Sequence, residues 1–258
     1  MAISLQSKNV LITGASAGIG AACAHEFAKC GANLILVARR GAQLIELSNI
    51  LKQNYGVECT VLELDVRDNA LVLESLASLP SQYREIDILV NNAGLVIGVE
   101  KAHETPEADV DTMLDTNVKG LLNMIRGVVP GMVKRNSGQV INISSIAGHE
   151  AYAGGSIYCA SKHAVDAITK SLRMDVVETN LRVGAISPGL VETEFSIVRF
   201  KGDTDRASSV YAGLESLVGQ DIAEAVLFTA TRPPHVQIAD LIIFPTSQAA
   251  ATVVHRDT

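Results

Sequence analysis

Short apolar runs alternate with longer amphipathic stretches along this chain of 258 residues. The apolar runs have the length of buried β-strands, and the stretches between them repeat their apolar positions at helical spacing. We expect strands at 10–13, 33–37, 57–64, 86–90, 139–143, 182–186 and 240–244. We expect helices at 18–30, 43–55, 69–79, 110–134, 156–179 and 221–229. This alternation predicts right-handed crossovers and an α/β fold with a doubly wound parallel sheet.

A single domain spanning residues 1–258 accounts for the whole pattern. The length is ordinary for one α/β domain with both sheet faces covered, and no internal repeat or low-complexity linker interrupts it. One long region, about 190–220, carries no strand pattern and comes just before the last helix and strand. Long excursions from a compact domain are usually functional. We therefore interpret this region as a lid over the substrate.

Charge and composition exclude several classes of protein. The chain has 21 Lys and Arg against 28 Asp and Glu, a net charge of −7, and no basic tract, so we expect no nucleic-acid partner. The N-terminus shows no signal-peptide pattern, and no window approaches the roughly 18 uncharged apolar residues of a membrane helix. The cysteines and histidines lack the spacing of metal ligands. We expect a soluble, cytoplasmic protein with no metal and no membrane contact.

The densest candidate chemistry lies around Tyr158. Tyr158 and Lys162 are four residues apart, so on a helix they share one face. An ammonium beside a phenol favours the phenolate, and we expect Lys162 to lower the pKa of Tyr158 and make it a general acid or base. Ser145 follows the apolar run 140–143, at the carboxyl end of a strand, where open α/β sheets bind ligands. Tyr-x-x-x-Lys alone would describe a solvated helix face, but the serine and a glycine-rich loop make it specific.

The glycine-rich segment TGASAGIG occupies residues 13–20 and follows the first strand. It places Gly14, Gly18 and Gly20 at a strand-to-helix turn. Glycines there let backbone N–H groups approach a pyrophosphate, which sits at the positive end of the following helix. The spacing G-x-x-x-G-x-G differs from the general dinucleotide pattern G-x-G-x-x-G. The segment predicts a dinucleotide cofactor.

The end of the second strand, LILVARR, indicates which nicotinamide cofactor binds. NAD enzymes place a carboxylate there for the ribose 2′-hydroxyl, whereas this chain offers Arg39 and Arg40 and no acid. We predict NADP, with Ser16 adding a hydroxyl to the same 2′-phosphate. The alternative for each arginine is a solvated position in the loop.

These motifs together resemble the short-chain dehydrogenase/reductase family, whose members have a Rossmann-like single domain. The matching segments are TGASAGIG at 13–20, NNAG at 91–94, TN at 116–117, ISS at 143–145, YCASK at 158–162 and SPGLVET at 187–193. Their order and spacing are those of the family, and the similarity spans nearly the whole chain. Segments 38–40, 155–162, 189–203 and 243–249 further resemble its NADP-dependent 3-hydroxy acid dehydrogenases, which include serine and L-allo-threonine dehydrogenases.

The resemblance implies roles for individual residues. Tyr158 would exchange a proton with the substrate oxygen, Ser145 would orient that oxygen, and Lys162 would also bind the nicotinamide ribose. Asn117 would hold a water that links Lys162 to solvent, although an asparagine in a long helix would otherwise indicate a core amide or a kink. NNAG would also stabilise the sheet. With the loop and the arginines, the expected cofactor contacts are Gly14, Ser16, Gly18, Ile19, Gly20, Arg39, Arg40, Asp65, Val66, Asn91, Ala93, Tyr158, Lys162, Pro188, Gly189, Val191 and Thr193.

Arg199, inside the proposed lid, is the candidate for substrate recognition. A guanidinium is a planar bidentate donor and suits a substrate carboxylate. Arg199 could instead be a surface residue or contact another subunit. Lys201 is a weaker candidate for binding the substrate carboxylate. The chain has no Trp and only five Phe and five Tyr, which disfavours a large aromatic pocket.

We therefore predict an NADP-dependent oxidoreductase that oxidises the 3-hydroxyl of small 3-hydroxy acids, such as L-serine, L-allo-threonine or 3-hydroxyisobutyrate, with Tyr158 as the base. Two alternatives stay open. One is a broad-specificity NADPH-dependent carbonyl or 3-oxoacyl reductase, and the other is a non-catalytic protein that senses NADP. The resemblance also implies a homotetramer, in which the helices at 110–134 and 156–179 pack between subunits.

Overall fold

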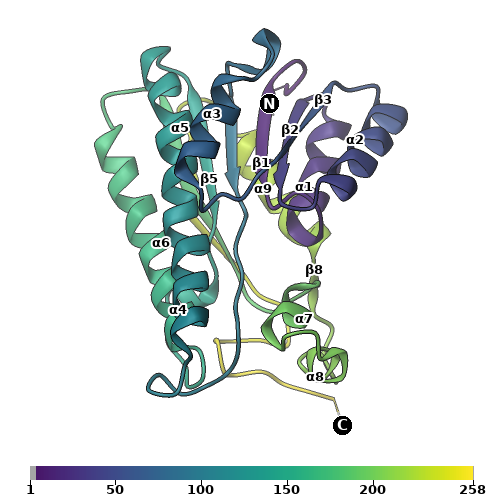
Figure 1. Cartoon of the computed structure of the whole chain (residues 1–258), viewed down its shortest axis with the longest axis vertical. Helices are drawn as coiled ribbons and strands as arrows, with labels where there is room; N and C mark the ends of the chain where they lie inside the picture. Colours follow the sequence, from purple (N-terminus) through teal and green to yellow (C-terminus); the bar gives the residue numbers. More distant parts are fainter. Residues whose placement is uncertain (1–3, 258) are drawn as a thin grey trace.

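A seven-stranded sheet forms the centre of the computed structural model, which describes residues 4–257 (Figure 1). The strand order is β3-β2-β1-β4-β5-β6-β9, and all neighbouring strands are parallel. The strands are β1 (Asn9–Thr13), β2 (Asn33–Ala38), β3 (Cys59–Glu63), β4 (Ile88–Asn91), β5 (Gly138–Ile143), β6 (Leu181–Pro188) and β9 (Asp240–Ile243). The order reverses beside β1, which leaves a crevice at the carboxyl ends of β1 and β4. The predicted doubly wound parallel sheet is confirmed.

Helices cover both faces of this sheet (Figure 1). Alternate residues of β1 serve the two layers, because Val10 and Ile12 belong to one buried cluster and Leu11 to the other. The first cluster includes residues of α1 (Gly18–Lys29), α2 (Gly41–Tyr55) and α9 (Gly219–Ala230). The second includes residues of α3 (Asn69–Ala77), α5 (Leu121–Lys134) and α6 (Ser156–Asp175). Burial on both faces explains why the strands have continuous apolar runs without polar alternation.

The helix expected at 110–134 is interrupted in the structure. Helix α4 (Glu107–Leu114) ends in a π-helical turn, η2 (Asp115–Gly120), before α5 begins. A π turn holds one more residue than an α turn, so it changes which side chains point inward, and such turns are frequent at functional sites. The apolar positions before and after the turn still have helical spacing, which is why the sequence pattern did not reveal it. Helix α6 also ends four residues before the expected position 179.

The expectation that 190–220 contains no strand was wrong. Strands β7 (Val191–Glu192) and β8 (Leu217–Val218) form a separate parallel pair. Two short helices, α7 (Phe195–Arg199) and α8 (Thr204–Ser209), lie between them and stand beyond the sheet at the lower right of Figure 1. Two-residue strands are too short to produce a periodicity in the sequence. We refer to residues 190–218 as the lid.

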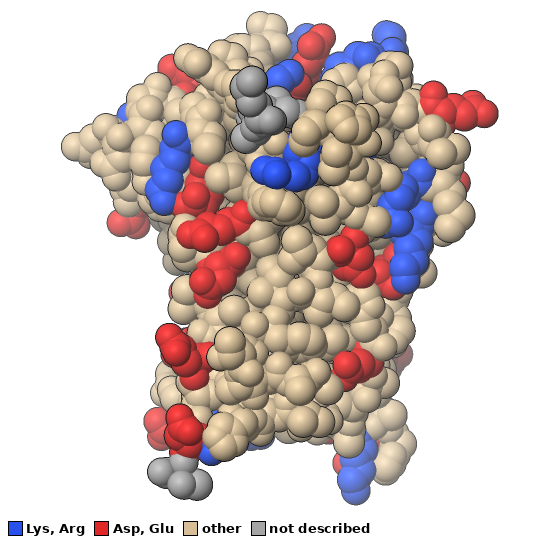
Figure 2. Space-filling model, turned by 180° about the vertical axis from the view of Figure 1, so that it is seen from behind, with Lys and Arg blue, Asp and Glu red and all other residues tan. Residues whose placement is uncertain are grey.

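Two 3₁₀ helices complete the described elements, η1 (Ser81–Tyr83) and η3 (Ile146–Gly148). Among residues 4–257, no helix combines the length and apolar character that crossing a membrane requires. Figure 2 shows basic and acidic side chains close to one another along the margins of one face, with a largely uncharged surface between them. The charge of the chain is thus mixed in sign on this face.

Candidate active site

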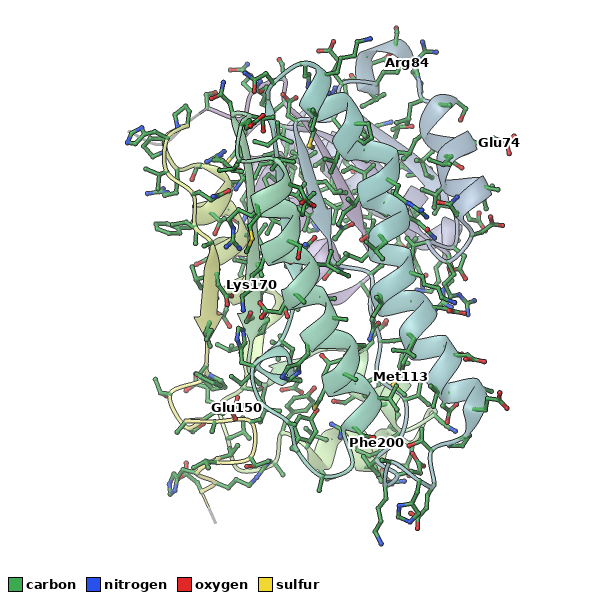
Figure 3. The ribbon with its side chains drawn as sticks, turned by 90° about the vertical axis from the view of Figure 1, so that its left-hand side faces the viewer. Glu74, Arg84, Met113, Glu150, Lys170 and Phe200 are labelled. Carbon is green, nitrogen blue, oxygen red and sulfur yellow. The ribbon has the colours of Figure 1, made fainter. Side chains whose placement is uncertain are left out.

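A cavity of about 460 Å³ opens at the carboxyl ends of the central strands. Gly14 follows β1, Asn92 follows β4 and Ser145 follows β5, and all three line this cavity. The lid covers its other side. In Figure 3, Phe200 of the lid and Glu150, which follows the end of β5, lie at one end of the molecule, opposite Arg84. The cavity therefore lies where open α/β sheets bind ligands.

The glycine-rich loop is held in one conformation by the neighbouring NNAG segment. Gly14 has φ +65°, a left-handed conformation that favours glycine. The Asn92 side-chain amide donates to the Thr13 carbonyl (2.9 Å) and the Gly14 carbonyl (3.3 Å). A Cβ on Gly20 would overlap the Gly14 carbonyl oxygen. The loop thus stays close-packed and open to a pyrophosphate at the start of α1.

Three groups gather at the end of β2, where the 2′-phosphate of NADP was expected. The Arg40 Nε donates to Ser16 Oγ (3.1 Å), and its Nη1 pairs with Glu194 Oε2 (2.9 Å). Arg39 is exposed and lines the same end of the cavity. This arrangement offers two guanidiniums and a hydroxyl to an anion.

Asp65, one of the expected cofactor contacts, lines the cavity but already has a partner. Arg67 donates to both of its carboxylate oxygens, with Nη2 2.6 Å from Oδ2 and Nε 3.0 Å from Oδ1. Partial burial raises the pKa of Asp65, but the hydrogen bonds from Arg67 outweigh burial and lower the pKa overall. The carboxylate is therefore held charged at a fixed position.

Ser145, Tyr158 and Lys162 all line the cavity. Ser145 lies just after β5, where its Oγ accepts from the Ala147 N–H (3.1 Å). Tyr158 and Lys162 project from the first turns of α6, and the Lys162 ammonium donates to the carbonyl of Ile143 (2.9 Å). The Lys162 Nζ lies 5.9 Å from the centre of the Tyr158 ring.

Burial shifts the two ionisable groups in opposite directions. It raises the pKa of Tyr158 well above its usual value, and the hydrogen bond from Ser145 offsets only part of this shift. It lowers the pKa of Lys162 to about 8. The expectation that Lys162 lowers the pKa of Tyr158 is wrong for the protein alone. The ammonium is directed to the Ile143 carbonyl, so it does not compensate the phenol for lost solvation.

Asn117 is buried in the π-helical turn, and its side chain is fully engaged. It accepts from the Leu95 N–H (2.8 Å) and donates to the Leu95 carbonyl (2.8 Å) and to Ser161 Oγ (3.0 Å). A Cβ built on Gly94 would lie 3.3 Å from Asn117 Oδ1 and 3.6 Å from Lys162 Nζ, so Gly94 lies close to both side chains. The observed contacts are those of a satisfied core amide, the alternative that the residue type indicates.

The lid brings Arg199 and two aromatic rings to the cavity. The Phe195 ring packs edge-on against Tyr158, with centroids 5.7 Å apart. The Tyr211 hydroxyl lies 2.6 Å from Ser196 Oγ and donates to the Val191 carbonyl (2.9 Å), which joins the two ends of the lid.

Arg199 lines the cavity at the end of α7 and is only partly exposed. Its Nε lies 3.4 Å from the Gly98 carbonyl. Among residues 4–257, no carboxylate lies within ion-pair distance of its guanidinium, whereas Lys201 pairs with Asp109 (2.8 Å). The guanidinium of Arg199 is therefore available to an anionic ligand.

Residues 8–203 match the sequence profile of the family described as short chain dehydrogenase. The chain belongs to this family. It is 44% identical to the NADP-dependent 3-hydroxy acid dehydrogenase of Schizosaccharomyces pombe. The aligned region of 253 residues covers 98% of each chain. It is 47% identical over 249 residues to the enzyme of the same name from Escherichia coli (strain K12), covering 96% of this chain and 99% of the relative. Sulfoacetaldehyde reductase 2 of Chromohalobacter salexigens is 42% identical over 250 residues, with coverage of 96% and 98%.

Among solved structures, the closed form of a serine dehydrogenase complexed with NADP+ is similar to this dehydrogenase. The two share 46% identity and a TM-score of 0.90, over 96% of this chain and 100% of the other. Both the predicted family and the predicted fold are thereby confirmed.

Most of the site residues expected from the sequence meet in the cavity of the dehydrogenase. Three do not line it. Asn91 is buried behind the cavity, where its side-chain amide donates to Asn142 Oδ1 (3.0 Å), and Gly20 and Asn117 support the loops around it. The expected residues that line it are Gly14, Ser16, Gly18, Ile19, Arg39, Arg40, Asp65, Val66, Ala93, Ser145, Tyr158, Lys162, Pro188, Gly189, Val191, Thr193 and Arg199.

Several lining residues were missed by the sequence analysis. Asn92 could have been found from the sequence, because it lies in the NNAG motif between Asn91 and Ala93, which were expected to contact the cofactor. Tyr152, Glu194 and Tyr211 also line the cavity, but no motif or spacing marks them. The positions of Glu194 and Tyr211 depend on how the lid folds back over the sheet, and Tyr152 lies in the turn before α6.

A polar trio outside the cavity was also not visible in the sequence. His149, Asp166 and Asp240 bring ligand-type atoms within 4.8 Å of one another. Asp166 already pairs with Lys170 (2.5 Å), and His149 Nε2 lies 3.0 Å from Ser187 Oγ and 3.3 Å from Asp240 Oδ2. The Lys170 ammonium disfavours a cation there, and the other contacts connect the turn at His149 to β6 and β9.

Proposed function

We propose that this dehydrogenase oxidises the 3-hydroxyl of small 3-hydroxy acids, such as L-serine, L-allo-threonine or 3-hydroxyisobutyrate, with NADP as its cofactor. NADP fits the observed residues, because the glycine loop is open to a pyrophosphate and Arg39, Arg40 and Ser16 stand where a 2′-phosphate would lie. When bound, the cofactor supplies the nicotinamide that accepts or returns the hydride. The relatives named as NADP-dependent 3-hydroxy acid dehydrogenases support this assignment.

The observation that carries the substrate class is the guanidinium of Arg199, whose polar contact is with the Gly98 carbonyl and not with an acid. It lines the same cavity as Ser145 and Tyr158 and has no acidic partner in the described part of the chain. A substrate carboxylate bound by Arg199 would leave the substrate hydroxyl to Ser145 and Tyr158. Charge-assisted bidentate pairs of this kind favour acids over neutral alcohols.

The chain's own residues then divide the proton chemistry. Ser145 orients the substrate oxygen, and Tyr158 takes the substrate proton as a phenolate during oxidation or returns it as a phenol during reduction. Lys162, whose pKa burial lowers to about 8, would hold the nicotinamide ribose. Asn117 keeps the loop around Leu95 in place beside Lys162, where the water relay to solvent would run.

Carbonyl reduction is the second candidate, and one observation favours it. Burial raises the pKa of Tyr158, so the phenol stays protonated and is suited to donating a proton to a carbonyl oxygen. A related chain is named a sulfoacetaldehyde reductase. The same residues would then act in the opposite direction on an oxo acid or a neutral carbonyl compound.

We also propose a homotetramer. Helices α5 and α6 run side by side along one face of the molecule (Figures 1 and 3), and exposed Met174 and Val133 lie at their ends. Phe228 of α9 and Ile242 of the edge strand β9 are also exposed. Two separate apolar faces suit the two kinds of interface in a tetramer with three two-fold axes. Sedimentation equilibrium should give four times the 27.3-kDa chain mass.

Initial rates test the proposed function. NADPH formation is measured with L-serine, L-allo-threonine, 3-hydroxyisobutyrate and a neutral secondary alcohol, each with NADP+ and with NAD+. We expect turnover of the acids with NADP+, and Tyr158→Phe should lose about 10²–10⁴-fold in kcat while still binding NADPH. Activity with the neutral alcohol alone would replace the proposal with a carbonyl reductase. Absence of activity in both directions, with NADPH still bound, would favour a sensor.

A further inference from the structure

The guanidinium of Arg40 connects two parts of the protein that are distant in the sequence. Its Nε donates to Ser16 Oγ in the glycine loop, and its Nη1 pairs with Glu194 Oε2 at the start of the lid (2.9 Å). All three residues line the cavity at the end that suits the 2′-phosphate. A carboxylate of the lid therefore already neutralises one of the groups that would bind this phosphate.

Packing of the lid against the loop brings this carboxylate into place. Thr193, one residue before Glu194, lies beside the glycine loop, since a Cβ on Gly18 would be 3.3 Å from the Thr193 side chain. Glu194 is the residue before α7, but its side chain makes no capping hydrogen bond to that helix. Both partners of the ion pair are substantially exposed, at 44% for Arg40 and 57% for Glu194. The Glu194 side chain has no other described role in the fold.

The 2′-phosphate and the Glu194 carboxylate carry charge of the same sign and need the same guanidinium. A phosphate close enough to bind Arg40 lies close enough to Glu194 for the two anions to repel each other. NAD carries a neutral hydroxyl at this position, so this repulsion does not apply to it.

We propose that Glu194 is a cofactor-specificity residue: its carboxylate pairs with Arg40 in the cofactor-free dehydrogenase and must give up this partner when NADP binds. The inference rests on the proposed use of NADP. It has a consequence for the lid, because Glu194 stands directly before the helix that carries Arg199. Exchange of partners at Arg40 removes the ion pair at the start of α7 as the cofactor site fills, and leaves the packing of Thr193 on the glycine loop.

Dissociation constants of NADPH and NADH, measured by titration of the cofactor's fluorescence, test the proposal in the wild type and in Glu194→Gln. The substitution keeps the shape of the side chain and removes its charge. We expect NADPH to bind about two- to fivefold more tightly, which is the scale of an exposed ion pair. The dissociation constant of NADH should stay unchanged. The gain should shrink as the ionic strength rises from about 0.02 M to about 0.5 M.

Glu192→Gln is the matched control. Glu192 lies two residues earlier on β7, is exposed, and accepts from Ser216 Oγ (3.0 Å) rather than from Arg40. It changes the net charge by the same amount, so it should leave both constants unchanged. In an Arg40→Met background, Glu194→Gln should have no further effect, because the pair is already broken.

Each other outcome is informative. Unchanged or weaker NADPH binding in Glu194→Gln would overturn the proposal, and weaker binding would mean that Arg40 holds the phosphate and the carboxylate together. Equal tightening of NADPH and NADH would also overturn it. Equal affinities of the wild type for NADPH and NADH would instead contradict the proposed cofactor, which separates failure of that assignment from failure of the Glu194 inference.

Discussion

At the scale of single residues, the geometry around Tyr158 and Lys162 determines what their spacing means. Four residues apart on α6, they share a face as the sequence indicates. Both are buried, and the Lys162 ammonium is hydrogen-bonded to the Ile143 carbonyl. Desolvation therefore controls both groups, keeping the phenol protonated and making the ammonium easier to deprotonate.

The free energy of unfolding should depend on pH through Lys162. The unfolded chain keeps this proton up to its ordinary pKa of 10.5, and the folded protein releases it near 8. Between these values the unfolded state binds more protons, so the free energy of unfolding rises with pH. Below pH 8 the folded protein carries the full free-energy cost of the buried ammonium. Lys162→Met removes this cost. Its stability advantage over the wild type should therefore shrink by roughly 2–3 kcal/mol between about pH 7 and pH 10.

Urea unfolding of both proteins at the two pH values measures this change. Lys170→Met, which removes a half-exposed lysine from the same helix, is the control. A pH-independent difference between Lys162→Met and the wild type would mean that Lys162 titrates near its ordinary pKa.

Substrate choice should depend on Arg199. For Arg199→Met we expect kcat/KM with L-serine to fall about 10–100-fold, because a charged hydrogen-bonded pair is lost. Turnover of a neutral alcohol should change less than about threefold. Arg206→Met is the matched control, since Arg206 packs on the Phe200 ring in the same lid without lining the cavity. Equal losses for acidic and neutral substrates would assign Arg199 a structural role.

At the scale of elements, the six-residue π-helical turn between α4 and α5 positions a loop of the candidate site. It turns Asn117 inward, where one amide satisfies both backbone groups of Leu95. Leu95 belongs to the loop after β4 that lines the cavity. The turn thus fixes a loop of the site through a buried polar contact, and such contacts are costly to leave unmade.

Asn117→Ala should therefore destabilise the whole protein. The buried N–H and C=O of Leu95 would lose their partners, at a cost of about 2–4 kcal/mol in the free energy of unfolding. Chemical unfolding monitored by circular dichroism measures this loss. If activity falls while stability stays unchanged, the role of Asn117 is in proton relay and not in support of the loop.

At the scale of the whole molecule, the site is closed by segments from three distant parts of the chain. The sheet provides the glycine loop and Ser145, the lid provides Arg199, and the C-terminal segment secures both. Gln248 accepts from the Leu190 N–H (2.8 Å) at the start of the lid, and Glu150 accepts from the Ala251 N–H (2.8 Å). Ligand binding at such a site should stabilise the fold as a unit.

Added NADP+ should raise the unfolding temperature more than NAD+ does. At a concentration 100 times its dissociation constant, a ligand adds about 2.7 kcal/mol to the free energy of unfolding. For a chain of this size each kcal/mol corresponds to a shift of about 2–4 °C. Differential scanning fluorimetry with equal concentrations of the two cofactors measures this difference. A larger shift with NAD+ would contradict the assignment of NADP.

The sequence by itself determined the layered fold, the cofactor class and the choice of Ser145, Tyr158 and Lys162, which line one cavity. These are local signals: apolar runs such as 140–143 form strands wherever both faces are buried, and a glycine that needs a positive φ, such as Gly14, is visible in the chain. Tertiary structure alone decided that Asn91 lies behind the cavity, that burial raises the pKa of Tyr158, and that Glu194 meets Arg40. Solvation and contacts between distant segments exist only once the chain is folded, so no pattern along the sequence can encode them directly.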